Sequence, residues 1–110
     1  MTRFRMHYLQ GFSAFWGLRF RTNIPHHTAW IFDLKRSTRI GAGIDMFFVF
    51  MEIGVLWLDA DKKVIDAALA KPFQMYWPKE KARYVVELHP EHLSSYQQGS
   101  RFSFDHAINV

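Results

Sequence analysis

The central apolar segment, residues 44–58 of this 110-residue chain, limits most strongly what the chain can fold into. Asp45, Glu52 and Gly54 interrupt it, and it is shorter than the roughly 20 residues that a membrane-spanning helix requires. Residues 46–51 are apolar at every position, which predicts a strand that is covered on both of its faces. A second strand is predicted over residues 55–58. The segment therefore indicates buried, extended structure in the core of a single domain.

Short strands separated by turn residues are predicted on both sides of this segment. Residues 59–62 are expected to form a turn, after which residues 63–70 pair back on the preceding strand as a hairpin. In residues 82–88 the pattern alternates, so even-numbered and odd-numbered side chains should lie on opposite faces of a strand. Further strands are predicted at residues 3–10, 29–34 and 101–104, with loops at residues 35–43 and 72–81.

Two short helices complete the predicted elements. Ser13 is a suitable N-cap for a helical turn over residues 14–20. Pro90 and Glu91 open a second helix, and Gly99 is expected to close it. Many short strands with little helix are typical of small all-β architectures. We therefore expect a mainly β fold, a single small β-sandwich or partly open barrel with one or two short helices, spanning residues 1–110.

Positive charge is concentrated in the first part of the chain. The net charge is +4, but residues 1–40 alone carry a net charge of +6, since they contain seven basic side chains and one acidic side chain, Asp33. A basic region can attract nucleic acid or a small anionic ligand, or it can simply be solvated surface. The basic side chains of this region are Arg3, Arg5, Arg19, Arg21, Lys35, Arg36 and Arg39.

The chain has no cysteine, which excludes disulfides, thiolate metal sites and cysteine nucleophiles. That composition is compatible with the cytoplasmic location that we expect, and residues 1–15 lack the apolar run of a signal peptide. His26 and His27 are adjacent and would point to opposite faces of a strand, whereas His89 and His92 are three residues apart. Because zinc sites take at least three protein ligands and no third ligand is assured, we predict neither a metal nor another cofactor.

The best candidate for a polar site combines Arg21, Asp45, Tyr84 and Glu87. Asp45 is the most informative of them, because it is a carboxylate at the edge of an apolar strand and buried charges need partners. Arg21 or His7 is a suitable partner. An ion pair that fixes the N-terminal region on the sheet is one interpretation, and the alternatives are ligand binding and general acid or base chemistry.

The aromatic side chains of the loop at residues 72–81 form a second candidate. Phe73, Tyr76 and Trp77 lie close together in the sequence. Aromatic side chains of this kind rim a ligand pocket or contact a partner, and Trp77 is the one that we place among the binding residues. The competing interpretation is that they cap an open end of a small barrel.

Four motifs, taken in order, resemble the domain-of-unknown-function one-nine-two family, an uncharacterised prokaryotic family. The resemblance covers residues 15–104 and implies a mainly β, sandwich-like fold with no established reaction. The motifs are Gly17-Leu18-Arg19-Phe20-Arg21, Met46-Phe47-Phe48-Val49-Phe50, Ile53-Gly54-Val55-Leu56-Trp57-Leu58-Asp59 continuing to Lys63-Val64-Ile65, and Ala82-Arg83-Tyr84-Val85-Val86-Glu87-Leu88.

The chain departs from this family pattern at four places. Relatives often have Pro and Asp where this chain has Glu52 and Gly54, and Gly-Asp where it has Gly99 and Ser100. If the family's polar residues form a shared site, the missing Asp at position 54 argues against that site here. Lys62 replaces a glycine in the hairpin turn, which predicts that Lys62 has the positive φ that glycine adopts at little cost.

No nucleophile motif and no phosphate-binding loop is present in the sequence. We therefore predict a non-catalytic domain that binds a small ligand, such as an anion, or a partner. Two alternatives remain open: nucleic-acid binding through the basic N-terminal third, and a small enzyme built on Asp45 and Glu87.

Overall fold

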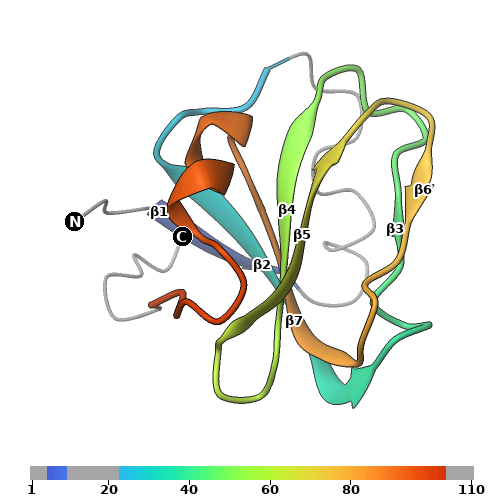
Figure 1. Ribbon diagram of the computed structural model, residues 1–110. Coiled ribbons are helices and arrows are strands. Elements are labelled where there is room, and N and C mark those ends of the chain that lie inside the picture. Colours follow the sequence, from blue (N-terminus) through green and yellow to red (C-terminus); the bar gives the residue numbers. More distant parts are fainter. Residues whose placement is uncertain (1–4, 10–22, 104–110) are drawn as a thin grey trace.

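A computed structural model describes residues 5–9 and 23–103 of the chain, with side chains described for residues 23–103. Within these residues the chain forms seven strands and one short 3-10 helix (Figure 1). The elements are β1 (Arg5–Leu9), β2 (Thr28–Thr38), β3 (Ile44–Asp45), β4 (Ile53–Leu58), β5 (Val64–Ala70), β6 (Met75–Tyr76), β7 (Ala82–Leu88) and η1 (Pro90–Ser95).

A five-stranded sheet in the order β1-β2-β7-β4-β5 forms the body of the molecule. β1 pairs with β2 in parallel, and all other neighbours in this sheet are antiparallel. β3 and β6 form a separate two-stranded sheet, which lies at one side of the molecule, whereas η1 lies at the opposite side (Figure 1). The predicted mainly β, sandwich-like class is confirmed, and the main sheet does not close into a barrel.

Both faces of the main sheet are covered, because alternate residues of its central strands belong to two different core clusters. Val55, Trp57 and Val85 pack on the face that is covered by the loops around β3 and β6. Leu56, Leu58, Val86 and Leu88 pack on the other face, with Phe102. The predicted alternation of residues 82–88 is therefore confirmed. β4 is buried at all six positions, which explains its continuous apolar sequence.

Residues 46–51 do not form the buried strand that their composition predicts. Met46 and Val49 are buried, but Phe47, Phe48 and Phe50 are each about half exposed. The segment is a turn, in which Val49 N donates to Met46 O over 3.2 Å and Phe48 has a φ of 60°. Only Met46 and Val49, three residues apart, pack into the core. The apolar composition of the segment does not reveal this spacing, so it does not distinguish a turn from a strand.

Three other predictions differ from the structure. β2 continues through Thr38, because Thr38 pairs with Ala82 beyond an irregularity in the ladder, so residues 35–38 are not loop. η1 ends at Ser95, and Gly99, whose φ is 90°, belongs to a later turn instead of closing the helix. Residues 101–103 form only an isolated bridge from Arg101 to Lys63. The predicted helix at residues 14–20 lies outside the described residues.

The hairpin between β4 and β5 agrees with the prediction, including its turn. Lys62 has a φ of 65°, and its backbone N donates to Asp59 O over 3.0 Å. The Asp59 carboxylate accepts from the backbone N of Asp61 at 2.8 Å and of Lys63 at 3.0 Å. These bonds fix the turn, and they give the Asp59 side chain a structural role.

Candidate functional site

The structure places two residues of the predicted polar cluster, Tyr84 and Glu87, on opposite faces of the main sheet. Arg21 lies outside the described residues, so its pairing stays a prediction. Tyr84 and Glu87 both belong to β7, but Tyr84 packs with the cluster of Leu56 and Leu58 while Glu87, like Val85, is on the opposite face. Asp45 belongs to β3, and its Oδ1 accepts from Phe47 N over 3.3 Å. Tyr84 and Glu87 therefore cannot act on one ligand.

Position 54 also faces away from Glu87. A Cβ at Gly54 would lie 2.9 Å from Leu88 Cδ1 and 3.1 Å from Leu93 Cγ. A carboxylate at this position would enter the apolar layer between β4 and η1, so it would not join a polar site with Glu87.

An ion pair between β2 and β7 was not predicted from the sequence. Arg83 Nε donates to Asp33 Oδ1 over 2.7 Å, and Arg83 Nη2 donates to Asp33 Oδ2 over 3.2 Å. The bonds from Arg83 lower the pKa of Asp33 from 3.8 to about 2. The two side chains lie on neighbouring strands with opposite charges, which is the usual arrangement of a pair that stabilises a sheet.

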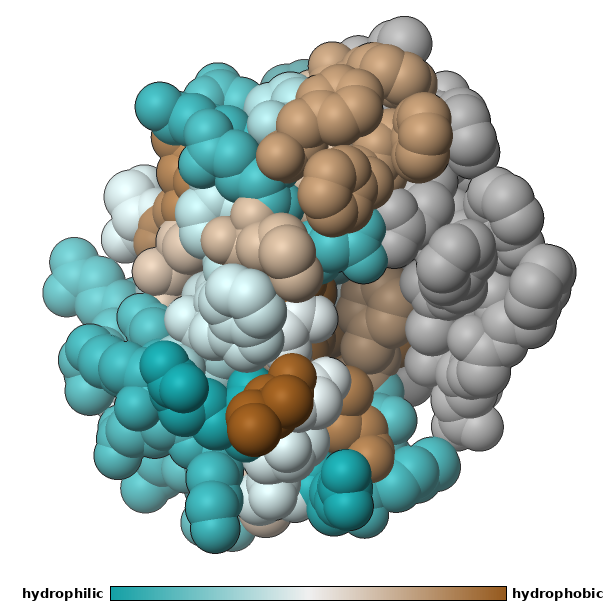
Figure 2. Space-filling view, turned by 90° about the vertical axis from the view of Figure 1, so that its right-hand side faces the viewer, coloured by the Kyte–Doolittle hydropathy of each residue, from teal (hydrophilic) through white to brown (hydrophobic). Residues whose placement is uncertain are grey.

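Apolar side chains gather on the side of the molecule formed by β3, β6 and their loops. This side faces the viewer in Figure 2, where a patch of apolar residues lies in the upper part of the view. We call the following residues the aromatic surface; each of their side chains is between 46% and 51% exposed: Phe47, Phe48, Phe50, Phe73, Met75 and Trp77. The prediction that Trp77 belongs to a binding surface is compatible with this arrangement.

The aromatic surface is held in place by backbone and ring contacts. Phe73 packs edge-to-face on Phe48 and Phe50, with ring centroids 6.2 and 5.7 Å apart. Phe73 N donates to Met46 O over 2.8 Å, which joins the two aromatic loops. Trp77 lies against Gly43, because a Cβ at Gly43 would be only 2.5 Å from the indole Nε1.

Two residues of this surface have strained backbone. Phe48 and Phe73 have φ values of 60° and 62°, in the left-handed region that bulky side chains rarely adopt. Such conformations cost on the order of 1–3 kcal/mol each and are enriched at binding and active sites. Backbone strain and exposed apolar area therefore occur at the same two residues.

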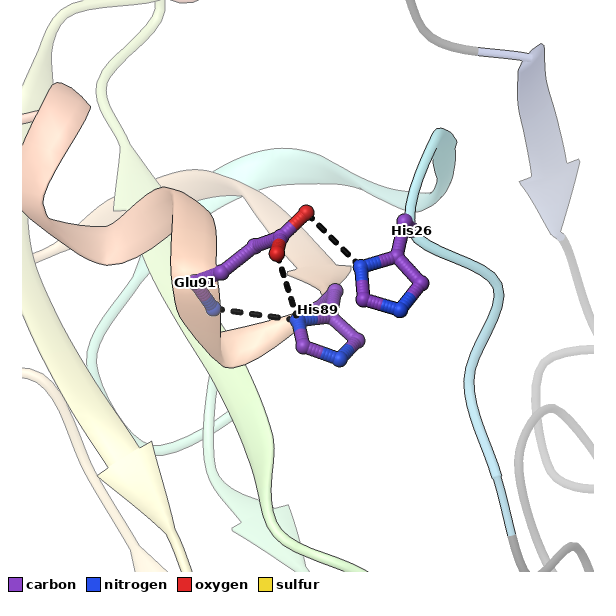
Figure 3. Close-up of side chains that lie close together, drawn as sticks. All are labelled: His26, His89 and Glu91. Carbon is purple, nitrogen blue, oxygen red and sulfur yellow. Dashed lines mark hydrogen bonds and ion pairs between the residues drawn. The ribbon is translucent and has the colours of Figure 1, made fainter.

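A second cluster lies at the other side of the molecule, where β2 begins and β7 ends (Figure 3). Trp30 of β2 pairs with Glu87 of β7, and continuing this antiparallel register places His26 opposite Glu91. His26 Nδ1 is 2.8 Å from Glu91 Oε1, and His89 Nδ1 is 4.0 Å from Glu91 Oε2. The rings of His26 and His89 stack with centroids 4.0 Å apart.

The environment of this cluster shifts two pKa values. Burial lowers the pKa of His89, and the nearby His26 adds to the effect. The hydrogen bond from His26 lowers the pKa of Glu91. Both shifts favour a neutral His89 and an ionised Glu91 near neutral pH. The sequence offered no signal for the cluster beyond its separate histidines, because the partners are far apart in the chain.

Fold and surface together define the class of this chain: a small, mainly β domain with an open main sheet and an exposed aromatic surface. Among the described residues, no helix has the length and apolarity needed to cross a membrane. The family model of DUF192, described as "Uncharacterized ACR", matches residues 10–104. The chain belongs to this family, which confirms the resemblance seen in its motifs.

Relatives in other organisms are uncharacterised as well. The chain is 44% identical over 73 residues to a UPF0127 protein of Thermococcus gammatolerans, a match that covers 66% of this chain and 46% of the relative. A UPF0127 protein of Pyrococcus furiosus is 40% identical over 73 residues, which covers 66% of this chain and 60% of the relative. The chain thus spans about half the length of these relatives.

Solved structures of the same fold come from two bacteria. A Sinorhizobium meliloti protein, described as a "putative transcription regulator", superposes with a TM-score of 0.76 over 87% of this chain and 76% of its own, at 17% identity. A protein of unknown function from Novosphingobium aromaticivorans has the same TM-score and identity, and covers 91% of this chain and 73% of its own. At this identity the likeness shows the fold alone.

Proposed function

We propose that this domain is a non-catalytic binding module whose aromatic surface docks an apolar segment of another protein. The observation that carries the proposal is the coincidence of half-exposed aromatic side chains with strained backbone at Phe48 and Phe73. Exposed apolar area and backbone strain both cost free energy, and a partner that covers the surface offsets the first cost. Because the chain contains no cysteine, we also propose that the protein is located in the cytoplasm.

Exposure and charge favour a protein partner over a small ligand or a nucleic acid. Small-molecule sites are concave and bury most of the ligand, whereas these side chains each leave about half of their area exposed. Residues 43–52 and 72–78, which carry the surface, contain two carboxylates, Asp45 and Glu52, and no Lys or Arg. Phosphate groups require basic side chains, so stacking on a nucleic acid is disfavoured here. Apolar side chains flanked by Lys or Arg are the complementary partner chemistry.

Nucleic-acid binding through the basic N-terminal third is an outcome that the test must distinguish. Lys35, Arg36 and Arg39 are exposed on β2 and its following loop. The description of the Sinorhizobium meliloti protein belongs to that protein, and a likeness at 17% identity supports only a shared fold. The enzyme alternative built on Asp45 and Glu87 stays a prediction.

A peptide selection with a matched control tests the proposal. Random peptides displayed on phage are selected on the full chain and then measured by fluorescence anisotropy against wild type and two variants. The double variant Phe50→Ser/Met75→Ser removes two half-exposed members of the surface. The control Leu69→Ser also removes an exposed apolar side chain, but Leu69 belongs to β5 of the main sheet and not to the aromatic surface; it is 41% exposed.

We expect selected peptides to be rich in aromatic or aliphatic residues next to Lys or Arg. Their affinity should fall at least about tenfold in Phe50→Ser/Met75→Ser and stay unchanged in Leu69→Ser, with circular dichroism showing that all variants fold. Equal binding by wild type and the double variant would refute the proposal. Binding to a DNA duplex that weakens steeply with salt, or to phosphatidylcholine vesicles, without any peptide binding would also refute it.

A further inference from the structure

We propose that His26, His89 and Glu91 bind one divalent transition-metal ion of the zinc class, at the side of the molecule opposite the aromatic surface. The three side chains converge from two elements, the turn before β2 and the start of η1 (Figure 3). One nitrogen or oxygen donor from each of them lies within 4.8 Å of the others. The site is independent of the protein-docking function proposed above.

The distances between the donors are close to those that a metal requires. With zinc–nitrogen and zinc–oxygen bonds of about 2.0–2.2 Å, two donors on a tetrahedral ion lie roughly 3.3–3.5 Å apart. His26 Nδ1 is 2.8 Å from Glu91 Oε1, and His89 Nδ1 is 4.0 Å from the other carboxylate oxygen, Oε2. With one donor atom taken from each residue, the donors lie within 4.8 Å of one another and must move closer to bind one ion. The rings of His26 and His89 are nearly parallel, at an interplanar angle of 20°, so the His26 ring must turn for the in-plane lone pairs of both rings to meet one ion. The side chains of His26 and Glu91 are 58% and 44% exposed, which leaves room for that rotation.

The hydrogen bond at His89 supports a ligand role. Glu91 N donates to His89 Nδ1 over 3.1 Å, so this nitrogen carries a lone pair and the ring proton is on Nε2. An ion that binds Nδ1 replaces the N–H of Glu91 as the partner of that lone pair.

A simple ion pair does not account for the whole cluster. One carboxylate needs one cation, yet His26, His89 and His92 all lie around Glu91, with His92 Nε2 at 3.4 Å from Oε1. The rings of His26 and His89 stack with centroids 4.0 Å apart, so both imidazoles lie beside the same carboxylate. The two histidines are therefore arranged as ligands and not as alternative cations.

His92 acts as a positioning residue for the site. Its side chain is buried, and its Nε2 is hydrogen-bonded to the backbone carbonyl of His26. This bond ties the turn before β2 to η1, and so it holds His26 beside Glu91. Supporting bonds of this kind orient metal ligands in known sites.

The donor set selects the metal. Two imidazoles and one carboxylate suit zinc and its neighbours, whereas calcium and magnesium require mostly oxygen ligands. Three protein ligands leave at least one coordination position for water or for a ligand.

Zinc titration with matched variants tests the proposal. Untagged full chain is titrated with ZnCl₂ against a chromogenic chelator, and thermal unfolding is recorded with and without zinc. The variants are His26→Ala, Glu91→Gln and His89→Asn, the last because Asn conserves the N-cap of η1 while removing the imidazole. His27→Ala is the control, since His27 is adjacent to His26 but outside the donor set.

We expect wild type to bind one zinc ion per chain and to unfold at a higher temperature in its presence. Each ligand variant should lose at least about tenfold in zinc affinity and lose the thermal shift, while His27→Ala keeps both. Absence of zinc binding in wild type overturns the proposal. Equal zinc affinity in His26→Ala and wild type, or equal affinity for calcium and zinc, also overturns it. Phe50→Ser/Met75→Ser should bind zinc normally, which separates this test from that of the aromatic surface.

Discussion

Replacing Lys62 by glycine should stabilise the domain, although it removes a side chain. Lys62 has a φ of 65° at the end of the turn between β4 and β5. Its backbone is fixed there by two bonds, from Lys62 N to Asp59 O and from Phe102 N to Lys62 O, each 3.0 Å long. The turn therefore keeps Lys62 in the left-handed region whatever its side chain does.

The magnitude follows from two opposing terms. A residue with a Cβ in the left-handed conformation costs roughly 1–2 kcal/mol, which glycine avoids. Glycine in turn has more freedom to lose on folding, which costs about 0.5–1 kcal/mol. The difference leaves Lys62→Gly more stable by about 0.5–1 kcal/mol. For a domain of this size that corresponds to a rise in Tm of about 2–6 °C.

Two control variants isolate the backbone effect. Lys62→Ala keeps the Cβ but loses the rest of the side chain, so any contacts of the Lys62 side chain are lost in both variants. Lys63→Gly places glycine at the next residue, which is not among the described residues with positive φ, and should destabilise by about 0.5–1 kcal/mol. Urea unfolding at constant slope gives the free energies. A midpoint of Lys62→Gly at or below that of Lys62→Ala would refute the reasoning.

Two further predictions concern the main sheet. Asp33→Asn should lower the free energy of unfolding at pH 7 by about 1–2 kcal/mol after allowance for solvent screening, because Arg83 lowers the pKa of Asp33 from 3.8 to about 2. This contribution is fully present above pH 3.8 and is lost as the pH falls through about 2. The difference between wild type and variant in urea unfolding should therefore shrink over this range, and a difference at pH 2 as large as that at pH 7 contradicts the assignment. Gly54→Ala should destabilise by roughly 1–2 kcal/mol, since its Cβ would lie 2.9 Å from Leu88 Cδ1, and an unchanged Tm would show that Leu88 and Leu93 move aside.

Sequence patterns predict correctly those parts of the fold that neighbouring residues determine. Alternation in β7 and the turn that joins β4 to β5 depend on neighbouring residues, and both agree with the structure. The extension of β2 to Thr38 depends on its pairing with Ala82, far along the chain, and no local pattern indicates it. The turn at residues 46–51 has the composition of a buried strand, since an exposed binding surface and a core use the same apolar side chains.

The candidate sites were less accessible to sequence reasoning than the fold. Trp77 was placed among the binding residues because aromatics cluster in its loop, but Phe48 and Phe50 were assigned to the core. Sequence spacing groups the histidines only as the pairs His26-His27 and His89 with His92, and it assures no third ligand. Only the register between β2 and β7 brings His26 to Glu91, and register between distant strands is set by tertiary packing.

Strand order also decides how quickly this domain can assemble. In the sheet β1-β2-β7-β4-β5, only β4 and β5 are joined by a short turn. The antiparallel neighbour of β2 is β7, which begins far along the chain at Ala82. Each of the other pairings loses the conformational entropy of a long loop before the hydrogen bonds between the strands can offset that loss. Topologies of this kind fold slowly, in the millisecond-to-second range. The β4–β5 hairpin is the natural nucleus, and β7 joins it to β2 in the sheet.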